Sequence, residues 1–131
     1  MVSHTINPDD APYDPESLPV KDECGTDGFV AVDMRVGRIV DVAPFPEARK
    51  PAWKIFVDFG PVIGTLQSSA QITNYSEADL RGRLVVGAVN LGRKRIAGFE
   101  SQFLVLGALE PDGTVLLLTP DGDPPLGAPI A

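Results

Sequence analysis

The chain is poor in the two side chains that most hydrolases and metal sites use, histidine and cysteine. Cys24 is the single cysteine, which excludes an internal disulfide and a cysteine-based metal cluster. His4 is the single histidine, so a Ser-His-Asp triad, a Cys-His pair or a histidine-rich zinc site has no histidine in the rest of the chain. These shortages argue against the common hydrolases and metalloenzymes. We expect a protein without catalytic residues, metal or cofactor.

The sequence also lacks a hydrophobic run long enough to cross a membrane. Its first residues, MVSHTINPDDAPYDPE, have neither the basic start nor the apolar centre of a signal peptide. We therefore expect a cytoplasmic protein that does not insert into membranes. With 131 residues, 44% of them hydrophobic, the chain is long enough for one domain with its own core.

Basic residues are outnumbered by acidic ones, but they are concentrated in the middle of the chain. The formal net charge is −7. Residues 1–24 carry −5 and residues 96–131 carry −5, whereas residues 33–95 carry +4. A basic region of this kind can bind an anion although the whole chain repels it, and the affinity should then fall steeply with salt.

The segment 90–107 (NLGRKRIAGFESQFLVLG) contains three consecutive cations between two apolar runs, Arg93, Lys94 and Arg95. Adjacent like charges repel each other, and an anionic partner is one reason to keep them together. The alternative is a hairpin tip that faces water. Both interpretations remain open from this segment alone.

Short alternating segments separated by proline and glycine predict a small β-barrel. We expect strands over residues 29–36, 53–59, 62–67, 84–91, 103–106 and 114–118, with a bulge or sharp bend at Gly37. Residues 76–79 (SEAD) have the form of a capping box at the start of a short helix that ends at Gly82. The predicted fold is all-β: a five-stranded OB-fold Greek-key barrel with a short helix between strands 3 and 4, plus terminal extensions.

The first part of the chain differs in composition from the rest. Prolines recur there among acidic and small polar residues, which disfavours regular structure. We predict an acidic, proline-rich N-terminal extension over residues 1–24 and an OB-fold domain over residues 25–131. The extension is either a flexible tail or an arm that packs on a partner subunit through Tyr13, Leu18 and Val20.

Five blocks of sequence, in order, carry a resemblance to a known family. They are residues 32–39 (VDMRVGRI), 45–49 (FPEAR), 57–60 (VDFG), 67–72 (QSSAQI) and 95–101 (RIAGFES). On these blocks, residues 29–131 resemble the CsaA proteins, which have a tRNA-binding OB domain like that at the C-termini of some methionyl-tRNA synthetases. The resemblance implies a homodimer that binds tRNA without catalysis. It also implies an alternative, an export chaperone that binds unfolded or preprotein polypeptides.

The tRNA-binding relatives carry a Lys-Met-x-Gly-x-x-Ser pattern before the fifth strand. The corresponding residues here are Arg95, Ile96, Gly98 and Ser101, so the cation, the turn and the hydroxyl are present. Glu100 departs from the pattern because it places a negative charge beside Ser101. The resemblance thus extends the candidate site from the three cations to Ser101.

The candidate RNA-binding residues combine phosphate-binding cations with polar side chains at strand ends. Cations can bind phosphates, and amides and hydroxyls can contact base edges or ribose hydroxyls. The alternatives are solvated turns for the cations and turn capping for the polar groups. The predicted RNA-binding residues are Arg49, Lys50, Ser69, Gln71, Asn90, Arg93, Lys94, Arg95 and Ser101.

Four other residues have both an RNA-binding and a structural interpretation. Trp53 and Phe56 could stack on bases, although the apolar alternation around Trp53 favours a place in the core. Arg35 and Arg38 on the first strand could bind RNA, but we expect them to pair with Asp33 or Asp41 across the sheet.

Overall fold

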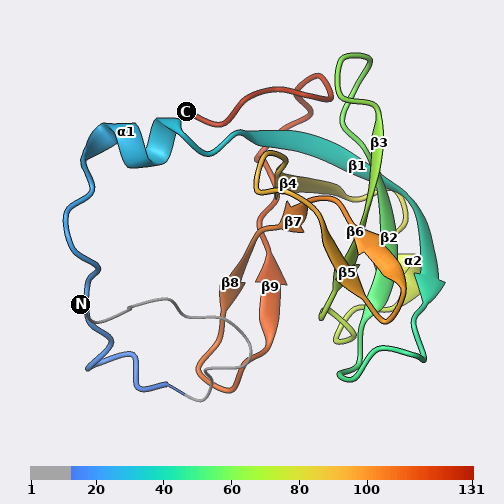
Figure 1. The fold of residues 1–131 in the computed structure, drawn as a ribbon, viewed down its shortest axis with the longest axis horizontal. Coiled ribbons are helices and arrows are strands. Elements are labelled where there is room, and N and C mark those ends of the chain that lie inside the picture. Colours follow the sequence, from blue (N-terminus) through green and yellow to red (C-terminus); the bar gives the residue numbers. More distant parts are fainter. Residues whose placement is uncertain (1–12) are drawn as a thin grey trace.

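The structure is a computed structural model that describes residues 13–131. Within these residues the regular structure is mostly β, with two short helices (Figure 1). The elements are, in order, α1 (Gly25–Val30), β1 (Met34–Pro44), β2 (Trp53–Asp58), β3 (Thr65–Ala70), α2 (Glu77–Leu80), β4 (Leu84–Ala88), β5 (Lys94–Ile96), β6 (Phe99–Ser101), β7 (Leu104–Val105), β8 (Gly107–Leu109) and β9 (Val115–Leu117). The predicted all-β class is confirmed.

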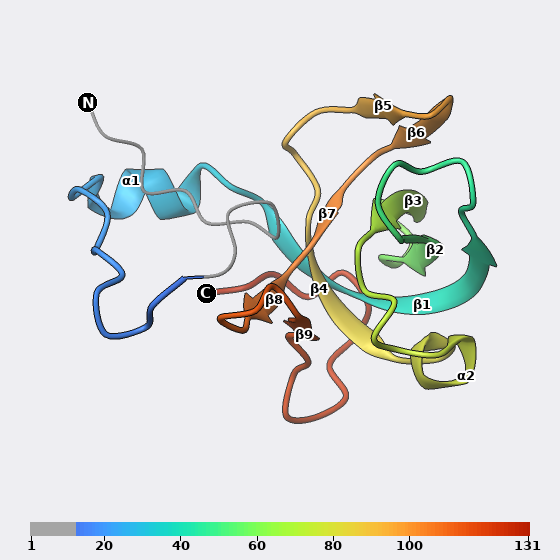
Figure 2. The same cartoon turned by 90° about the horizontal axis from the view of Figure 1, so that it is seen from below.

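Five strands form one antiparallel sheet in the order β3-β2-β1-β4-β7. The long strand β1 pairs with β4 over residues 34–38 and with β2 over residues 38–44, so it serves two sides of the molecule. The open edges approach each other where the backbone N–H of Gln102 donates to the carbonyl oxygen of Gln67 at 2.8 Å. The sheet therefore nearly closes into a barrel (Figures 1 and 2), and α2 lies between β3 and β4 as expected for an OB-fold.

The bulge in β1 lies three residues after Gly37, the position where a bulge or sharp bend was predicted. Ile39 pairs with Val57 but Asp41 pairs with Phe56, so the unpaired bulge residue is Val40, not Gly37. At Gly37, a Cβ atom would lie 2.5 Å from Cγ1 of the buried Val57. Gly37 is therefore required for close packing across the barrel, and the bulge follows it.

The first predicted strand begins five residues late in the structure. Residues 25–30 form α1, and the strand starts at Met34. The backbone N–H of Ala31 donates to the carbonyl of Asp27, and that of Val32 donates to Phe29, which closes helical turns where we expected extended backbone. The part of the predicted alternation that precedes Met34, residues 29–33, was too short to distinguish a strand end from one turn of helix.

Three further strand boundaries differ from the prediction. The third strand begins at Thr65, because Gly60 and Gly64 (φ +90° and +80°) form a turn that leaves Val62 exposed. The fourth strand ends at Ala88. Of the predicted fifth strand, only Leu104 and Val105 form a strand, β7, which pairs with β4. The residues that follow form β8, which pairs with β9 in a separate hairpin.

The predicted capping box is confirmed at the start of α2. The Ser76 hydroxyl accepts a hydrogen bond from the Asp79 N–H at 3.1 Å, and the Asp79 carboxylate accepts one from the Ser76 N–H at 3.3 Å. This helix places Leu80 in the core, which lies between the barrel strands. The core is built from Ile39, Val42, Ile55, Val57, Phe59, Ala70, Ile72, Leu80, Val85, Phe103 and Leu117.

The described part of the N-terminal extension contacts the barrel's own hairpin. The backbone N–H of Tyr13 donates to Pro111 at 3.0 Å, and its hydroxyl donates to the carbonyl of Leu109 at 2.5 Å. Tyr13 thus packs on β8–β9 of the same chain, while Leu18 and Val20 are exposed. The predicted features of residues 1–12 lie outside the described residues. None of the helices in residues 13–131 is long and apolar enough to span a membrane.

Candidate nucleic-acid interface

The three predicted cations lie at the start of a hairpin rather than in a loop. Lys94 pairs with Ser101 and Arg95 with Glu100 across β5 and β6. Ala97 and Gly98 form the turn, both with positive φ (47° and 81°). This geometry is that of a type I′ turn, which suits the twist of a two-residue hairpin.

Aromatic side chains hold the β5–β6 hairpin against the β1–β2 loop. The Phe99 ring lies 5.4 Å from the Phe45 ring and 6.4 Å from the Phe56 ring, both edge-to-face. The Lys54 ammonium lies 4.8 Å and 5.1 Å from the centres of the Phe45 and Phe99 rings. These contacts fix the position of the hairpin, because edge-to-face pairs and cation–π contacts are directional. Phe56 therefore packs in this cluster.

The hairpin, the β1–β2 loop and the end of β3 enclose an open depression of about 360 Å³, which we call the cationic depression. Four of its lining side chains are cationic, and no carboxylate among the described residues lines it. Six of the nine predicted RNA-binding residues line it: Arg49, Lys50, Ser69, Gln71, Lys94 and Arg95. Residues far apart in the sequence thus converge on one surface.

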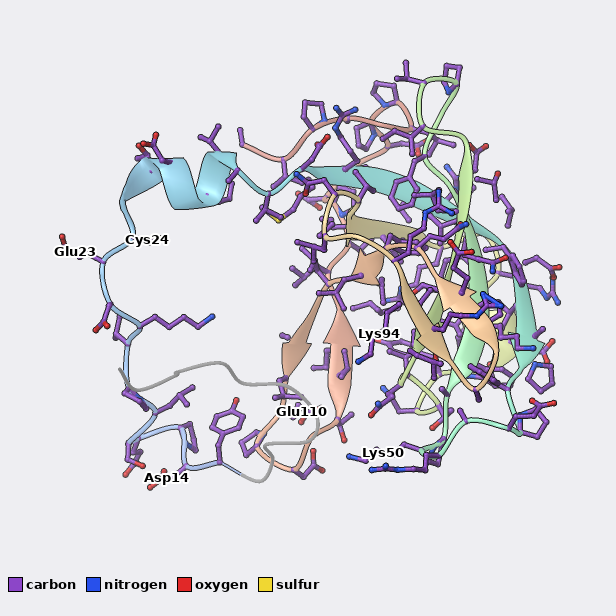
Figure 3. All side chains as sticks on the ribbon, in the orientation of Figure 1. Asp14, Glu23, Cys24, Lys50, Lys94 and Glu110 are labelled. Carbon is purple, nitrogen blue, oxygen red and sulfur yellow. The ribbon has the colours of Figure 1, made fainter. Side chains whose placement is uncertain are left out.

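Residues 13–24, the described part of the acidic extension, lie away from the cationic depression. Figure 3 shows Lys50 and Lys94 on the barrel, whereas Asp14 and Glu23 lie on the extension well away from both. The four cations are all exposed. A positive local field can therefore form on this surface despite the net charge of −7.

Arg93 does not line the cationic depression. It is paired with an acid on the neighbouring strand. Its Nη1 lies 2.5 Å from Oε1 of Glu100. The hydrogen bond from Arg93 lowers the pKa of Glu100 below its ordinary value, and the positive charges of Arg93 and Arg95 add to the effect. Glu100 is therefore a competitor for any phosphate that approaches Arg93.

Ser101 ties the hairpin to β3. Its hydroxyl lies 3.1 Å from the Ser68 hydroxyl and accepts a hydrogen bond from the Ser69 N–H at 3.4 Å. Ser68 is buried and donates to the carbonyl of Phe103 at 2.8 Å. Ser101 thus belongs to a part-buried polar network that holds β6 beside β3 and reaches the buried Ser68.

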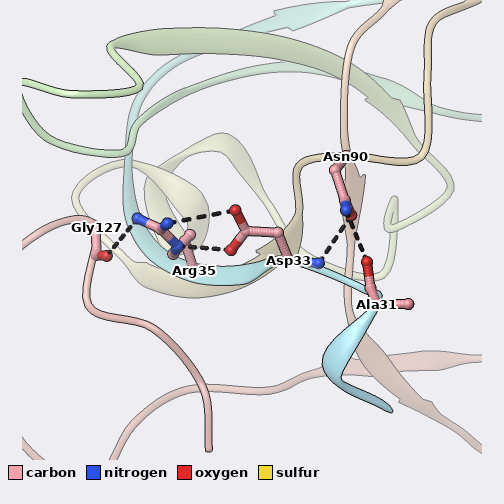
Figure 4. A network of polar contacts seen from close by, with 5 residues as sticks. All are labelled: Ala31, Asp33, Arg35, Asn90 and Gly127. Atoms are coloured by element: carbon pink, nitrogen blue, oxygen red, sulfur yellow. Dashed lines mark hydrogen bonds and ion pairs between the residues drawn. The ribbon is translucent and has the colours of Figure 1, made fainter. Parts of the chain in front are cut away.

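Asn90 lies on a different part of the barrel from the cationic depression. Its side-chain oxygen accepts the Asp33 N–H, and its amide donates to the carbonyl of Ala31, both at 2.8 Å (Figure 4). These bonds attach the end of α1 to the end of β4. Of the nine predicted residues, Asn90, Arg93 and Ser101 are thus the three that the structure does not place in the lining of the depression.

The two arginines of β1 are engaged in ion pairs. Arg35 pairs with Asp33 at 2.6 Å, which is one of the two predicted partners. The pair joins residues two apart on the same segment, however, and does not cross the sheet. Its guanidinium also donates to the carbonyl of Gly127 (Figure 4). Arg38 pairs with Asp123 at 3.2 Å, so the expected pairing with Asp33 or Asp41 is wrong for this residue.

The sequence analysis missed the surface beside Trp53. Trp53 packs against the core but is half-buried, and its indole N–H donates to the carbonyl of Tyr75 at 3.0 Å. It lines a second depression of about 410 Å³ together with the proline-rich loop that follows β1. The sequence feature that could have predicted this depression is the segment from Pro44 to Trp53, in which prolines and small residues precede a tryptophan.

A family model and the sequences of known proteins point to the same family. Residues 34–129 match the family model described as "Putative tRNA binding domain". The methionine–tRNA ligase of Thermococcus onnurineus is 39% identical over 102 residues, which are 78% of this chain and 14% of that protein. The chain thus spans about one seventh of the length of the curated relatives it matches.

Solved structures resemble the whole barrel. The crystal structure of the CsaA chaperone protein from Picrophilus torridus has a TM-score of 0.79 and 46% identity, and the match covers 83% of this chain and 100% of that one. The chaperone CsaA of Bacillus anthracis has a TM-score of 0.79 and 41% identity, with coverage of 84% and 100%. The family match, the barrel and these neighbours agree: the chain belongs to the tRNA-binding domain family, as a CsaA-like member.

Proposed function

We propose that the chain is a non-catalytic tRNA-binding protein that acts in the cytoplasm and holds RNA phosphates in the cationic depression. The observation that carries the proposal is the convergence of Arg49, Lys50, Lys94 and Arg95 on one surface that no carboxylate of residues 13–131 lines. Arginine can bind two phosphate oxygens at once, and lysine adds a point charge. We assign this role to residues 25–131 and regard residues 1–24 as an acidic extension.

Polar side chains beside the cations supply contacts that phosphates alone do not. Ser69 and Gln71 line the same depression, at the end of β3 and just beyond it. A hydroxyl and an amide there can contact ribose hydroxyls or the edges of unstacked bases. In this proposal Ser101 positions Ser69 through their hydrogen bond, Asn90 supports the barrel, and Arg93 contacts phosphate only after release from Glu100.

A gel-shift titration of tRNA at several salt concentrations tests the proposal. The variant Arg93→Ala/Lys94→Ala/Arg95→Ala should lose most of the binding seen at low salt. Arg81→Ala is the matched control, because Arg81 is an exposed arginine paired with Asp41 and Glu77 outside the depression. Wild-type protein that fails to bind tRNA at low salt, or a triple variant that binds like wild type, would contradict the proposal.

We also propose that the chain forms a homodimer. Apolar side chains remain exposed on α1, where Phe29 and Val30 are 47% and 73% exposed. A depression of about 500 Å³ lies between this helix and the C-terminal residues Pro129 and Ile130. A dimer that covers these groups would present two cationic depressions and so raise avidity for one RNA that reaches both. Light scattering should give twice the chain mass of 13.9 kDa, and the single mass would refute the dimer.

A second candidate function is the binding of unfolded polypeptide. An apolar depression of about 360 Å³ runs beside β7 and β8, with Leu104, Leu109 and Val115 in its lining and no charged residue among the described residues that line it. An extended chain could bury hydrophobic side chains there. Capture of an unfolded, uncharged polypeptide that persists at high salt would support this function, whereas RNA binding should weaken with salt.

A further inference from the structure

The depression beside Trp53 differs in character from the cationic depression. The β1–β2 loop contributes prolines and small residues, and Thr73 contributes an exposed side chain from the turn before α2. Arg49 is the single charged residue among the described residues that line it. Its volume of about 410 Å³ lies within the range of small-molecule sites. We call it the Trp53 depression.

The two depressions adjoin each other. Ala48, Arg49 and Ala52 line both of them. Ala48 and Ala52 have small side chains, and Arg49 is the cation at this shared edge. One ligand can therefore occupy both, with an anionic part in one and an apolar part in the other.

Trp53 is held in place before any ligand binds. It begins β2, where it pairs with Ala70 of β3, and its indole N–H donates to the carbonyl of Tyr75. The polar atom of the ring is thus already satisfied, which leaves the ring's apolar surface for contact. A fixed aromatic ring loses little entropy when a planar group packs on it, and aromatic–base stacking tolerates any base.

A nucleotide joins a charged phosphate to a planar apolar base. The cationic depression matches the phosphate, and the adjoining Trp53 depression matches the base. We propose that the Trp53 depression holds an unpaired nucleobase of the RNA whose phosphates lie in the cationic depression. The base must be unpaired because bases within a duplex are stacked on their neighbours and cannot reach the ring. This inference rests on the proposed function and names the part of the RNA that the site recognises.

Fluorescence provides a direct test, because Trp53 is the single tryptophan of the chain. The probes are a single-stranded oligoadenylate, inorganic polyphosphate of similar length, and whole tRNA. Oligoadenylate should quench the tryptophan fluorescence on binding, since a base then contacts the indole. Polyphosphate should bind without quenching, because it has no bases.

A variant that fills the Trp53 depression tests the same point by affinity. Thr73→Tyr adds a ring at an exposed position that lines the Trp53 depression but not the cationic one. It should weaken oligoadenylate binding roughly five- to 150-fold, the loss expected for one stacked base, and leave polyphosphate binding unchanged. Thr119→Tyr is the control, because Thr119 is also exposed and lines neither depression.

Each result decides the inference. Oligoadenylate that fails to bind, binds without quenching, or binds Thr73→Tyr as tightly as wild type would overturn the base site, while the proposed function stands if tRNA still binds. Equal loss of polyphosphate binding in Thr73→Tyr would also overturn it, because the added ring would then act on the phosphates. If Thr73→Tyr instead weakens only the capture of an unfolded polypeptide, the depression belongs to the second candidate function.

Discussion

Replacing Lys94 and Arg95 together by alanine should halve the dependence of tRNA binding on salt. Four cations line the cationic depression, and this double variant removes two of them. Each phosphate that a cation neutralises releases counterions, and release lowers the affinity as salt rises. The slope of this salt dependence therefore reports the number of cation–phosphate contacts, whatever the absolute affinity is.

The magnitude follows from the number of lining cations. Four phosphate contacts give a slope of the logarithm of affinity against the logarithm of salt between about −2.8 and −3.6. From about 50 to about 200 mM salt, wild-type binding should weaken roughly 50- to 150-fold. With two contacts the slope falls to between about −1.4 and −1.8, and the same change in salt weakens binding only about 7- to 12-fold.

Fluorescence anisotropy with labelled tRNA at five or more salt concentrations measures both slopes. Arg93→Ala is the informative comparison, because Arg93 is paired with Glu100 and lies outside the lining, so its slope should stay near that of wild type. Equal slopes for wild type and Lys94→Ala/Arg95→Ala would refute the reasoning. A fall in slope for Arg93→Ala as large as that for the double variant would refute the assigned geometry.

Four other changes have defined outcomes. Glu100→Lys removes a competing acid and should tighten tRNA binding in the same assay, and an unchanged affinity would place the hairpin outside the contact. In Arg93→Ala the pKa of Glu100 should rise toward its ordinary value, as measured by a carboxyl NMR titration. In wild type the lowered pKa of Glu100 stabilises the fold above the ordinary pKa, and this stabilisation is lost as the pH falls through the lowered pKa. Arg93→Ala should remove this stabilisation. Gly37→Ala should reduce the free energy of urea unfolding by about 1–3 kcal/mol through overpacking, whereas Gly122→Ala, where a Cβ meets open space, should not. Ser101→Ala should cost about 1–3 kcal/mol of stability, since a buried partner hydroxyl loses a bond, with little change in the salt slope.

The local features of the fold were predictable because their causes are local. The capping box before α2 was readable from Ser76 and Asp79, since both hydrogen bonds join residues three apart. Alternation over β2 and the apolar run of β4 indicated their burial. The bulge at Val40 was not predictable, because it depends on which residues of β2 lie opposite.

The same difference between local and long-range causes explains which predicted site residues line the cationic depression. Charge made Lys50 and Lys94 candidates, but only closure of the barrel and the Phe45–Phe99 contact bring their loops to one depression. Asn90 was equally plausible as an amide at a strand end. Its two hydrogen bonds to the backbone around α1 could not be predicted, because they join Asn90 to Asp33 and Ala31, which lie 57 and 59 positions away in the sequence.

The sequence by itself determined the all-β class, the helix between the third and fourth strands, the cationic segment and the family, because periodicity, the capping box and motif blocks reside in neighbouring residues. The tertiary structure decided which cations share a surface, which acid holds Arg93, and that a proline-rich loop and Trp53 adjoin that surface. The physical reason is that an electrostatic field and a depression are sums over groups close in space, and the spacing of those groups is set by packing across the barrel.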